Sequence, residues 1–159
     1  MKQVVVYTDG ACRGNPGPGG WGAVLLLRGS DARREISGGF SLTTNNRMEV
    51  TAVLEALSAL KRPCDVDVYT DSRYVRDAVE KGWLASWLAK NWVKPDKQPV
   101  KNVDLWQKLL PLLERHTVRF HWLKGHSGHA ENERCDELAC LAADAASLLP
   151  DKGYVEERG

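Results

Sequence analysis

The sequence predicts an α/β domain in which helices cover one mixed five-stranded sheet. Three apolar, β-branched segments come first and are joined by Gly-rich turns, whereas from Asn46 onward strand patterns alternate with helical ones. Short turns make the first three strands antiparallel neighbours, and a helix between two strands allows a parallel crossover. We therefore expect strands one, four and five to be parallel.

Each strand and the first helix follow from a local pattern. The strands are expected at residues 3–8, 21–28, 33–40, 65–70 and 117–123. A helix from Asn46 repeats apolar residues at helical spacing until Pro63 stops it. Those apolar residues are Val50, Val53, Leu54, Leu57 and Leu60.

The remaining helices are expected at 72–81, at 102–115 and at 131–146. The second of them places Val103, Trp106, Leu109, Leu110 and Leu113 on its buried side. The last carries a stripe of small residues, Ala139, Ala142, Ala143 and Ala146, which suits close packing on the sheet. Residues 147–159 form a polar C-terminal tail, and the part after Pro150 is expected to fray.

Length and charge bound the class of protein. A chain of 159 residues fits one domain, and its net charge of +1 excludes a polycation. Charge is nevertheless segregated, because residues 82–101 hold four lysines against one acid. No apolar stretch approaches the length that spans a bilayer, and the amino terminus lacks a signal region, so we expect a soluble cytoplasmic protein.

The four cysteines lack a paired framework spacing, which favours reduced thiols. His126, His129, Cys135 and Cys140 fall within fifteen residues and raise the alternative of a zinc site. On the expected helix, however, Cys140 is turned about 140° away from Cys135, which disfavours zinc. The Gly-rich segment 14–22 also contains a formal GxGxxG match, but a strand follows it rather than a helix, so we interpret it as a hairpin.

The tetrapeptide Val-Tyr-Thr-Asp occurs twice, ending in Asp9 and in Asp71, each time after an apolar run. Each aspartate should stand at the carboxyl end of a strand, where ligands bind in open α/β sheets. If a helix crosses over between the two strands, Asp9 and Asp71 lie side by side.

Two further carboxylates lie near helix starts. Glu49 fits a capping box with Asn46, and Asp136 lies early in the last helix, where an acid favours the dipole. Asp71 could likewise be only an N-cap, and Asp9 only part of a turn with Gly10. Taken together, the four acids indicate hard oxygen ligands gathered on one edge, which suit Mg²⁺ or Mn²⁺.

Four segments in order resemble type 1 ribonuclease H, the bacterial HI enzyme, over residues 2 to about 145. They are Tyr7-Thr8-Asp9-Gly10 with Gly14-Asn15-Pro16-Gly17, Thr44-Asn45-Asn46-Arg47-Met48-Glu49, Thr70-Asp71-Ser72-x-Tyr74-Val75, and Lys124-Gly125-His126-Ser127-Gly128-His129 with Asn132-Glu133-x-x-Asp136. The resemblance implies the ribonuclease H-like fold over a single domain at 1–146. It also implies that Asp9, Glu49, Asp71 and Asp136 bind metal.

The implied reaction is cleavage of the RNA strand of RNA–DNA hybrids, leaving 5′-phosphate and 3′-hydroxyl ends. Two Mg²⁺ ions, with Mn²⁺ as the alternative, would serve it. By the same resemblance Asp9 bridges the ions, Glu49 and Asp71 hold the ion nearer the leaving group, and Asp136 helps to hold the other. His126 is expected to move protons as an accessory group.

Substrate contacts are also implied by the resemblance. The RNA strand, whose 2′-hydroxyls distinguish it, would meet Gly10, Cys12, Asn15, Asn45, Asn46 and Arg73. Arg73 replaces a Gln of some relatives. Thr44 and Asn102 match the family's pocket for a DNA phosphate, although Leu42 stands where an Arg is often found.

The DNA strand would meet the segment 82–101, which we name the basic protrusion. It holds Trp83 and Trp87 among its lysines, although their spacing of four equally fits a packing stripe on a short helix. Leu88 and Ala89 stand where relatives often carry basic residues, so affinity for the DNA strand is expected to be weaker and more easily lost in salt.

Two alternative functions remain open beside the hybrid nuclease. A DNA-cutting nuclease of the same fold would have similar acids but no reason for the Asn45-Asn46 pair or for the basic protrusion. A catalytically silent hybrid-binding module would lack a carboxylate, and none is missing. Because Met1 lies just before the first strand, a domain cut from a polymerase is not favoured. We expect a monomer whose partner is an RNA–DNA hybrid and not a membrane.

Overall fold

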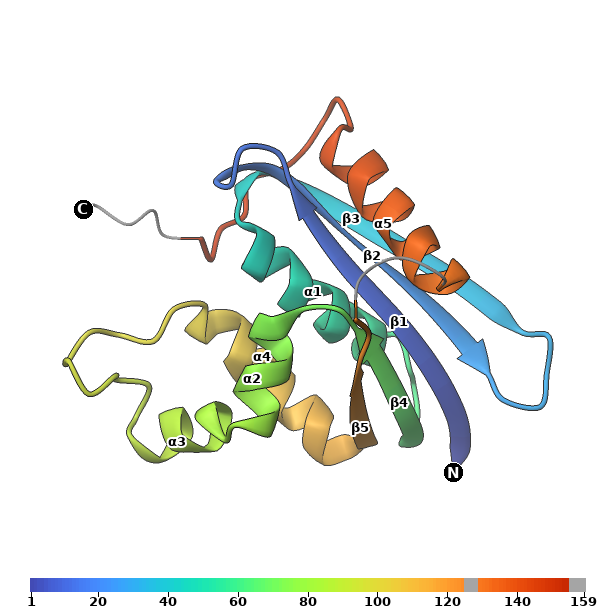
Figure 1. Ribbon diagram of the computed structural model, residues 1–159, viewed down its shortest axis with the longest axis horizontal. Coiled ribbons are helices and arrows are strands. Elements are labelled where there is room, and N and C mark those ends of the chain that lie inside the picture. Colours follow the sequence, from blue (N-terminus) through green and yellow to red (C-terminus); the bar gives the residue numbers. More distant parts are fainter. Residues whose placement is uncertain (125–128, 155–159) are drawn as a thin grey trace.

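The described residues, 1–124 and 129–154 of the computed structural model, contain one five-stranded sheet (Figure 1). Its order is β3-β2-β1-β4-β5. The strands are β1 (Lys2–Cys12), β2 (Gly17–Leu27), β3 (Arg33–Thr43), β4 (Cys64–Thr70) and β5 (Thr117–Trp122). The first three are antiparallel, and β1, β4 and β5 are parallel, which confirms the predicted sheet.

The first strand is longer than its sequence pattern indicated. β1 runs three residues past Asp9, because Gly10, Ala11 and Cys12 pair with residues at the start of β2. Asp9 itself pairs with Gly22, so the expectation that the strand ends at this aspartate, and its interpretation as a turn, are wrong. Only the parallel ladder with β4 stops before Asp9, at the pair Tyr7–Tyr69.

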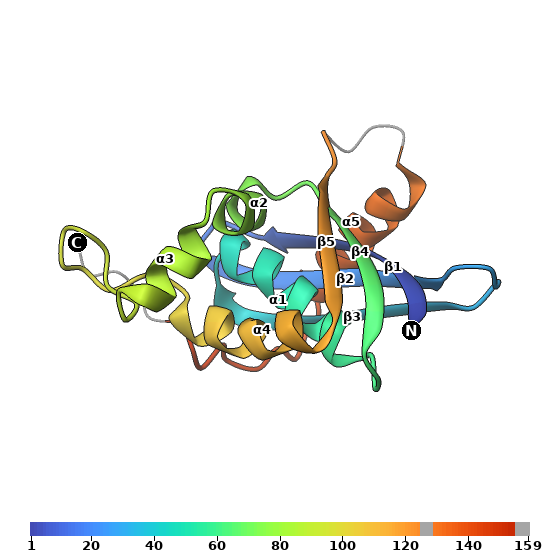
Figure 2. The same cartoon turned by 90° about the horizontal axis from the view of Figure 1, so that it is seen from below.

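Helices cover both faces of the sheet (Figure 2). On one face lie α1 (Asn45–Ser58) and α4 (Val103–Arg115), with α2 (Arg73–Glu80) beside them. On the other face α5 (Ala130–Ala143) packs on β1, β2 and β3. The short α3 (Trp83–Ala89) and the loop after it project to one side of the molecule.

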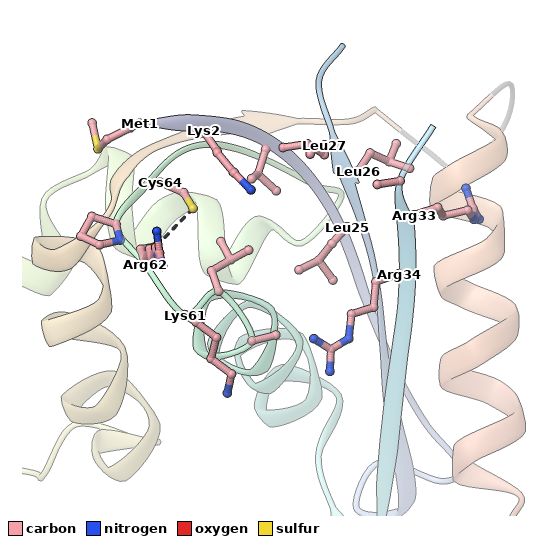
Figure 3. A pocket seen from close by; sticks show the side chains of 15 residues that line it. Met1, Lys2, Leu25, Leu26, Leu27, Arg33, Arg34, Lys61, Arg62 and Cys64 are labelled. Atoms are coloured by element: carbon pink, nitrogen blue, oxygen red, sulfur yellow. Dashed lines mark hydrogen bonds between the residues drawn. The ribbon is translucent and has the colours of Figure 1, made fainter. Parts of the chain in front are cut away.

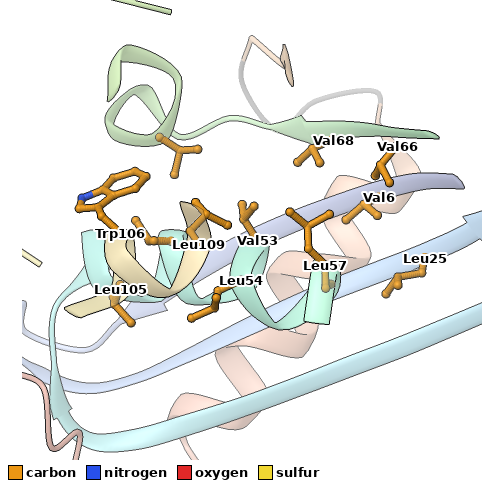
Figure 4. Close-up of a cluster of buried hydrophobic side chains, with 14 of the residues drawn as sticks. Val6, Leu25, Val53, Leu54, Leu57, Val66, Val68, Leu105, Trp106 and Leu109 are labelled. Atoms are coloured by element: carbon orange, nitrogen blue, oxygen red, sulfur yellow. The ribbon is translucent and has the colours of Figure 1, made fainter. Parts of the chain in front are cut away.

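The main hydrophobic core lies between the sheet and α1 with α4 (Figure 4). Val6, Val66 and Val68 of the strands face Val53 and Leu57 of α1. On α4 the expected core positions Trp106 and Leu109 are fully buried, and Leu110 and Leu113 are partly buried. This layer fixes α1 against β1 and β4, the three elements that position Glu49, Asp9 and Asp71.

The last helix lies very close to the sheet, as its small residues predicted. A Cβ atom added to Gly20 would stand 2.1 Å from Ala139 O, and one added to Gly22 would stand 2.6 Å from Cys135 O. Ala139 and Ala143 are buried. The helix ends at Ala143 rather than at residue 146, and Ala146 is exposed, so the predicted stripe is one residue too long.

The tail was expected to fray, but its described part is bound to the domain. Leu149 forms a parallel bridge with Phe40 at the outer edge of β3, and Ser41 N–H donates to Leu149 O at 2.9 Å. Asp151 accepts hydrogen bonds from Thr43 and Arg47. The prediction of fraying is therefore wrong as far as residue 154, because ion pairing and backbone pairing hold this segment.

A cavity of about 750 Å³ lies where the β2–β3 hairpin, the end of α1 and the start of β4 meet (Figure 3). Leucines line it, and five basic residues, Lys2, Arg33, Arg34, Lys61 and Arg62, surround it. It contains none of the predicted site residues. Among the described residues, no helix is long and apolar enough to cross a membrane.

Candidate active site

The two Val-Tyr-Thr-Asp segments bring their aspartates together as predicted. β1 and β4 are parallel and in register up to Tyr7 and Tyr69, each two residues before its aspartate. Carboxylate oxygens of Asp9, Asp71 and Glu49 all lie within 4.8 Å of one another. Because these residues come from β1, from the end of β4 and from α1, the sheet crossover itself creates the cluster.

Glu49 belongs to this cluster and not to a helix cap. The N-cap of α1 is Thr44, whose side chain accepts a hydrogen bond from Arg47 N–H at 3.2 Å. Glu49 Oε1 instead accepts from Gly10 N–H at 2.6 Å. A Cβ atom on Gly10 would lie 2.6 Å from Glu49 N, so only glycine allows α1 to approach β1 this closely. The predicted capping box between Asn46 and Glu49 is wrong.

Asp71 does not cap a helix either. The cap of α2 is the next residue, Ser72, whose Oγ accepts from Val75 N–H at 3.2 Å. Trp122 of β5 donates its indole N–H to Asp71 O at 3.3 Å. The Trp122 hydrogen bond holds the backbone carbonyl of Asp71, and the N-cap interpretation of this aspartate is wrong.

Asp136 faces the same cavity from the opposite layer. The cavity is about 370 Å³ in volume, and Asp136 lines it together with the other three acids. Asp136 does not belong to the group of three carboxylates that lie within 4.8 Å of one another. Its negative charge nevertheless helps to raise the pKa of Asp9. The structure thus brings all four predicted carboxylates to one cavity, with Asp9, Glu49 and Asp71 in closest contact.

The electrostatics of the cluster favour a bound cation. Asp9 is 2% exposed and Glu49 4% exposed. Burial raises the pKa of Asp9 to about 7, and Asp71 and Asp136 add to the shift. Burial also raises the pKa of Glu49, as does the neighbouring Asp9. Among the described residues, Asp9 Oδ2 and Glu49 Oε2 are buried without a hydrogen-bond donor, as oxygens that await a divalent cation would be.

The predicted RNA contacts gather around the same cavity only in part. Gly10, Asn45, Asn46 and Arg73 line it. Asn15 lies beside them, since its Oδ1 accepts from Asn45 N–H at 2.9 Å. Cys12 points elsewhere, and its thiol lies 3.3 Å from Thr43 O.

The other predicted contacts do not line the cavity. Trp83 and Trp87 are on α3, where their ring centroids are 6.1 Å apart, and Trp87 packs in turn on Trp106. Asn102 precedes α4 and bonds to Arg47 and to Tyr74. His126 lies outside the described residues.

Sequence reasoning missed two residues of the cavity and one neighbour. Ser72 and Tyr74 line it, although each was quoted only as part of a motif. Trp122 lies under two guanidinium groups, those of Arg76 at 4.5 Å and Arg73 at 5.9 Å from its ring centroid. Alternation along β5 places Trp122 on the α2 side of the sheet, but no signal in the sequence pairs it with these arginines.

Comparison with known sequences identifies close relatives. The model of the RNase H family matches residues 1–144. The chain is 64% identical over 156 residues to the ribonuclease H of Nitratidesulfovibrio vulgaris (strain DSM 19637 / Miyazaki F), covering 98% of this chain and 99% of that one. It is 60% identical over 139 residues to the ribonuclease H of Agrobacterium fabrum (strain C58 / ATCC 33970), covering 87% and 93%.

Solved structures share the fold. LC9-RNase H1, described as a type 1 RNase H with the type 2 active-site motif, superposes with a TM-score of 0.79 at 34% identity, covering 90% of this chain and 72% of that one. LC11-RNase H1, solved in complex with RNA/DNA hybrid, gives a TM-score of 0.68 at 28% identity, covering 89% and 96%.

Proposed function

The chain belongs to the type 1 ribonuclease H family and hydrolyses RNA–DNA hybrids, and we propose that Asp9, Glu49, Asp71 and Asp136 perform this hydrolysis with two divalent cations. The observation that carries the proposal is the cluster itself. Three carboxylates lie within 4.8 Å, and two of them have buried oxygens without donors. Such a group is costly unless a cation binds it.

Divalent cations bound there would neutralise charge on the scissile phosphate, lower the pKa of the attacking water and stabilise the departing 3′ oxygen. The chain's own residues hold the carboxylates for this purpose. Gly10 N–H fixes Glu49, and Asp9 interacts with Glu49, Asp71 and Asp136, so Asp9 is the acid that we expect would contact both cations. Mg²⁺ suits these hard oxygen ligands, with Mn²⁺ as the alternative. The products would carry 5′-phosphate and 3′-hydroxyl ends.

Recognition of the RNA strand is proposed for the polar rim of the cavity. Asn45 and Asn46 begin α1 beside Glu49, and Asn15 supports the backbone of Asn45. Amide side chains and Gly10 can meet 2′-hydroxyls, which a DNA strand lacks. Arg73 offers a charge to a phosphate at the same rim, while Trp122 lies within cation–π distance of it.

A proton-transfer role is proposed for His126. It precedes α5, which carries Asp136, by only a few residues of sequence. An imidazole titrates near neutrality and can exchange protons with the attacking water or the product. We expect His126→Ala to slow turnover without abolishing it.

The basic protrusion is proposed to hold the DNA strand. It is adjacent in sequence to α2, whose first residue, Arg73, lines the cavity. Its charge is +3, from four lysines and one aspartate, which gives 4 − 1. Trp83 is 37% exposed and is therefore accessible to a nucleic acid.

The test offers end-labelled RNA–DNA, RNA–RNA and DNA–DNA duplexes to wild type and to Asp9→Asn, with Mg²⁺ or with EDTA. We expect Mg²⁺-dependent cutting of the RNA strand of the hybrid only, and a decrease of at least about 10³-fold in the variant, since several kcal/mol of transition-state stabilisation disappear. Cutting of the DNA duplex would favour the DNA nuclease. Binding of the hybrid without cutting would favour the silent module. Full activity of the variant would refute the assignment of the carboxylates.

A further inference from the structure

Arg47 is the most completely paired buried cation that the described part of the chain contains. It is 2% exposed, although it lies in the first turn of α1. Its three guanidinium nitrogens donate to Asp104, to Asp151 and to Asn102, all within 2.7–3.2 Å. Every N–H of the guanidinium is thereby used. Two of these partners stand at the start of α4, and the third belongs to the tail.

The C-terminal tail covers Arg47 through the contact with Asp151. We name residues 149–154 the C-terminal strap. It begins beside β3 with the bridge from Leu149 to Phe40, and Asp151 then accepts from Thr43 Oγ1 and from Arg47 Nε, both at 2.7 Å. Gly153 lies so close that a Cβ atom there would stand 1.9 Å from Asp104 Oδ2. The strap therefore covers the pair of Arg47 and Asp104.

The other partners of Arg47 mark the end of the basic protrusion. Asn102 follows the protrusion directly, adopts φ of 62°, and is the N-cap residue of α4. Its side chain is used at both ends, because Oδ1 accepts from Arg47 and Nδ2 donates to Tyr74 Oη at 3.0 Å. Tyr74 lines the carboxylate cavity and accepts from Trp106. A continuous set of hydrogen bonds thus runs from Asp151 to the cavity wall.

We propose that Asp151, acting through Arg47 and Asn102, is a positioning residue that fixes the basic protrusion relative to the carboxylate site and thereby sets affinity for long hybrids. The inference rests on the proposed function of the protrusion. The side chain of Asp151 is 8% exposed, and Asp151 does not line the carboxylate cavity. Its effect must therefore be indirect.

Removal of the Asp151 charge leaves Arg47 buried with only one carboxylate and one amide. A buried ion whose partner is removed is strongly destabilised, and the local structure shifts to restore its pairing. The nearest group able to shift is the start of α4, because Asn102 joins it to a loop that projects from the domain. The acids of the cavity are held separately by β1, β4 and Gly10 N–H. Loss of the Asp151 charge should therefore change the affinity for hybrid and leave kcat unchanged.

The experiment compares wild type, Asp151→Asn and the control Glu35→Gln. Glu35 is matched because it also accepts from two side chains, those of Arg33 and Arg134, but it joins β3 to α5. A long hybrid and a hybrid too short to reach the protrusion are used. The short hybrid is one that the triple variant Lys90→Gln, Lys94→Gln, Lys97→Gln binds as tightly as wild type does. Kd is measured in EDTA by fluorescence anisotropy, and KM and kcat are measured in Mg²⁺.

We expect Asp151→Asn to raise Kd and KM for the long hybrid about tenfold, equivalent to about 1.4 kcal/mol, with kcat unchanged and with no effect on the short hybrid. Glu35→Gln should leave all three values unchanged. Equal Kd for wild type and Asp151→Asn on the long hybrid, an equal rise on both hybrids, or a fall in kcat alone would overturn the proposal. If wild type fails to cut either hybrid, the proposed function fails instead.

A second variant distinguishes a loss of positioning from unfolding of Asp151→Asn. Thr43→Val keeps the shape of the side chain and removes only the hydroxyl that donates to Asp151. We expect it to raise Kd for the long hybrid in the same direction but by a smaller factor, about threefold, at a temperature well below its Tm. An unchanged Kd in folded Thr43→Val, together with an unfolded Asp151→Asn, would reduce the strap to a stability element and overturn its positioning role.

Discussion

At the scale of the residue, the proposed chemistry depends on placing carboxylates where they repel one another. Asp9 and Glu49 are almost fully buried, and Asp71 and Asp136 add negative charge nearby. The sequence already indicated the meeting of Asp9 and Asp71, because a repeated tetrapeptide in two parallel strands puts equivalent residues side by side. It could not indicate that Gly10 N–H draws Glu49 inward, because this contact joins residues 39 positions apart.

The raised pKa of Asp9 has a consequence for stability without metal. Its pKa is about 7 in the folded protein and about 4 in an unfolded chain, so the folded state binds the proton more tightly. Protonation of Asp9 therefore contributes to the free energy of unfolding, by at most about 4 kcal/mol. This contribution is fully present below pH 4 and is lost as the pH rises through 7. In EDTA, wild type should therefore melt at lower temperature at pH 8 than at pH 5.

Asp9→Asn should reduce this dependence, leaving the part that comes from the raised pKa of Glu49, and should raise the Tm at pH 8. Mg²⁺ should raise the Tm of wild type there more than that of the variant. Calorimetry at several pH values checks both expectations. Asp31→Asn, a change at an exposed aspartate, is the control. Parallel Tm curves for wild type and Asp9→Asn would contradict the buried-charge explanation.

At the scale of the element, sequence patterns located the strands and helices but not their ends. Gly10 suggested that β1 stops, yet the strand continues because Gly20 and its neighbours in β2 offer partners. Thr44, Asn45 and Asn46 are all good N-caps, and tertiary packing decides among them. The strap has no periodicity at all, since Asp151 is fixed by an arginine 104 residues earlier. Local signals cannot report such partners.

The close packing of α5 on β2 predicts the effect of one methyl group. In Gly20→Ala the new Cβ would meet Ala139 O and Ala143 N, which are backbone atoms and cannot swing away. We expect the free energy of unfolding to fall by about 2–3 kcal/mol, and hybrid cleavage to slow because α5 carries Asp136. Urea denaturation measures the first and an activity assay the second.

Gly29→Ala is the reference for that experiment. Its φ of 77° strains an alanine, but no atom lies within 4 Å of the added Cβ, so a cost of about 1 kcal/mol with normal cleavage is expected. Gly20→Ala with the stability and activity of wild type would show that α5 does not need its present distance from the sheet.

The two tryptophans of α3 are expected to have different roles, Trp87 in core packing and Trp83 in hybrid binding. Trp87 lies between Trp83 and Trp106, with ring centroids 6.1 and 6.0 Å away, and packs against the core. Trp87→Ala should lower the free energy of unfolding by about 2–4 kcal/mol. Trp83 is exposed, so Trp83→Ala should leave the Tm nearly unchanged and weaken hybrid binding by about 1–2 kcal/mol. Thermal melts and anisotropy in EDTA distinguish the two, and the reverse result would assign Trp83 to packing.

At the scale of the whole molecule, charge is distributed unevenly about a net value of +1. One basic group surrounds the cavity between the β2–β3 hairpin and α1 (Figure 3), and another belongs to the protrusion, whose α3 projects at the end of the molecule opposite that hairpin (Figure 2). Because the two groups lie at opposite ends of the molecule, we expect a hybrid held at the carboxylates to meet only the protrusion. The position of the lysines, more than their number, should then decide affinity for hybrids.

Neutralising Lys90, Lys94 and Lys97 to Gln tests this separation. Each lysine that no longer meets a phosphate should reduce the slope of log affinity against log salt by about 0.9, so the slope should become shallower by at most about 2.7, with kcat at saturation unchanged. The control removes the same charge around the other cavity, by Lys2→Gln, Lys61→Gln and Arg62→Gln. Because both triple variants have the same net charge, a general field effect would change their slopes equally. Equal slopes would therefore contradict a binding role for the protrusion, whereas a change confined to the Lys90, Lys94 and Lys97 variant would place the DNA strand there.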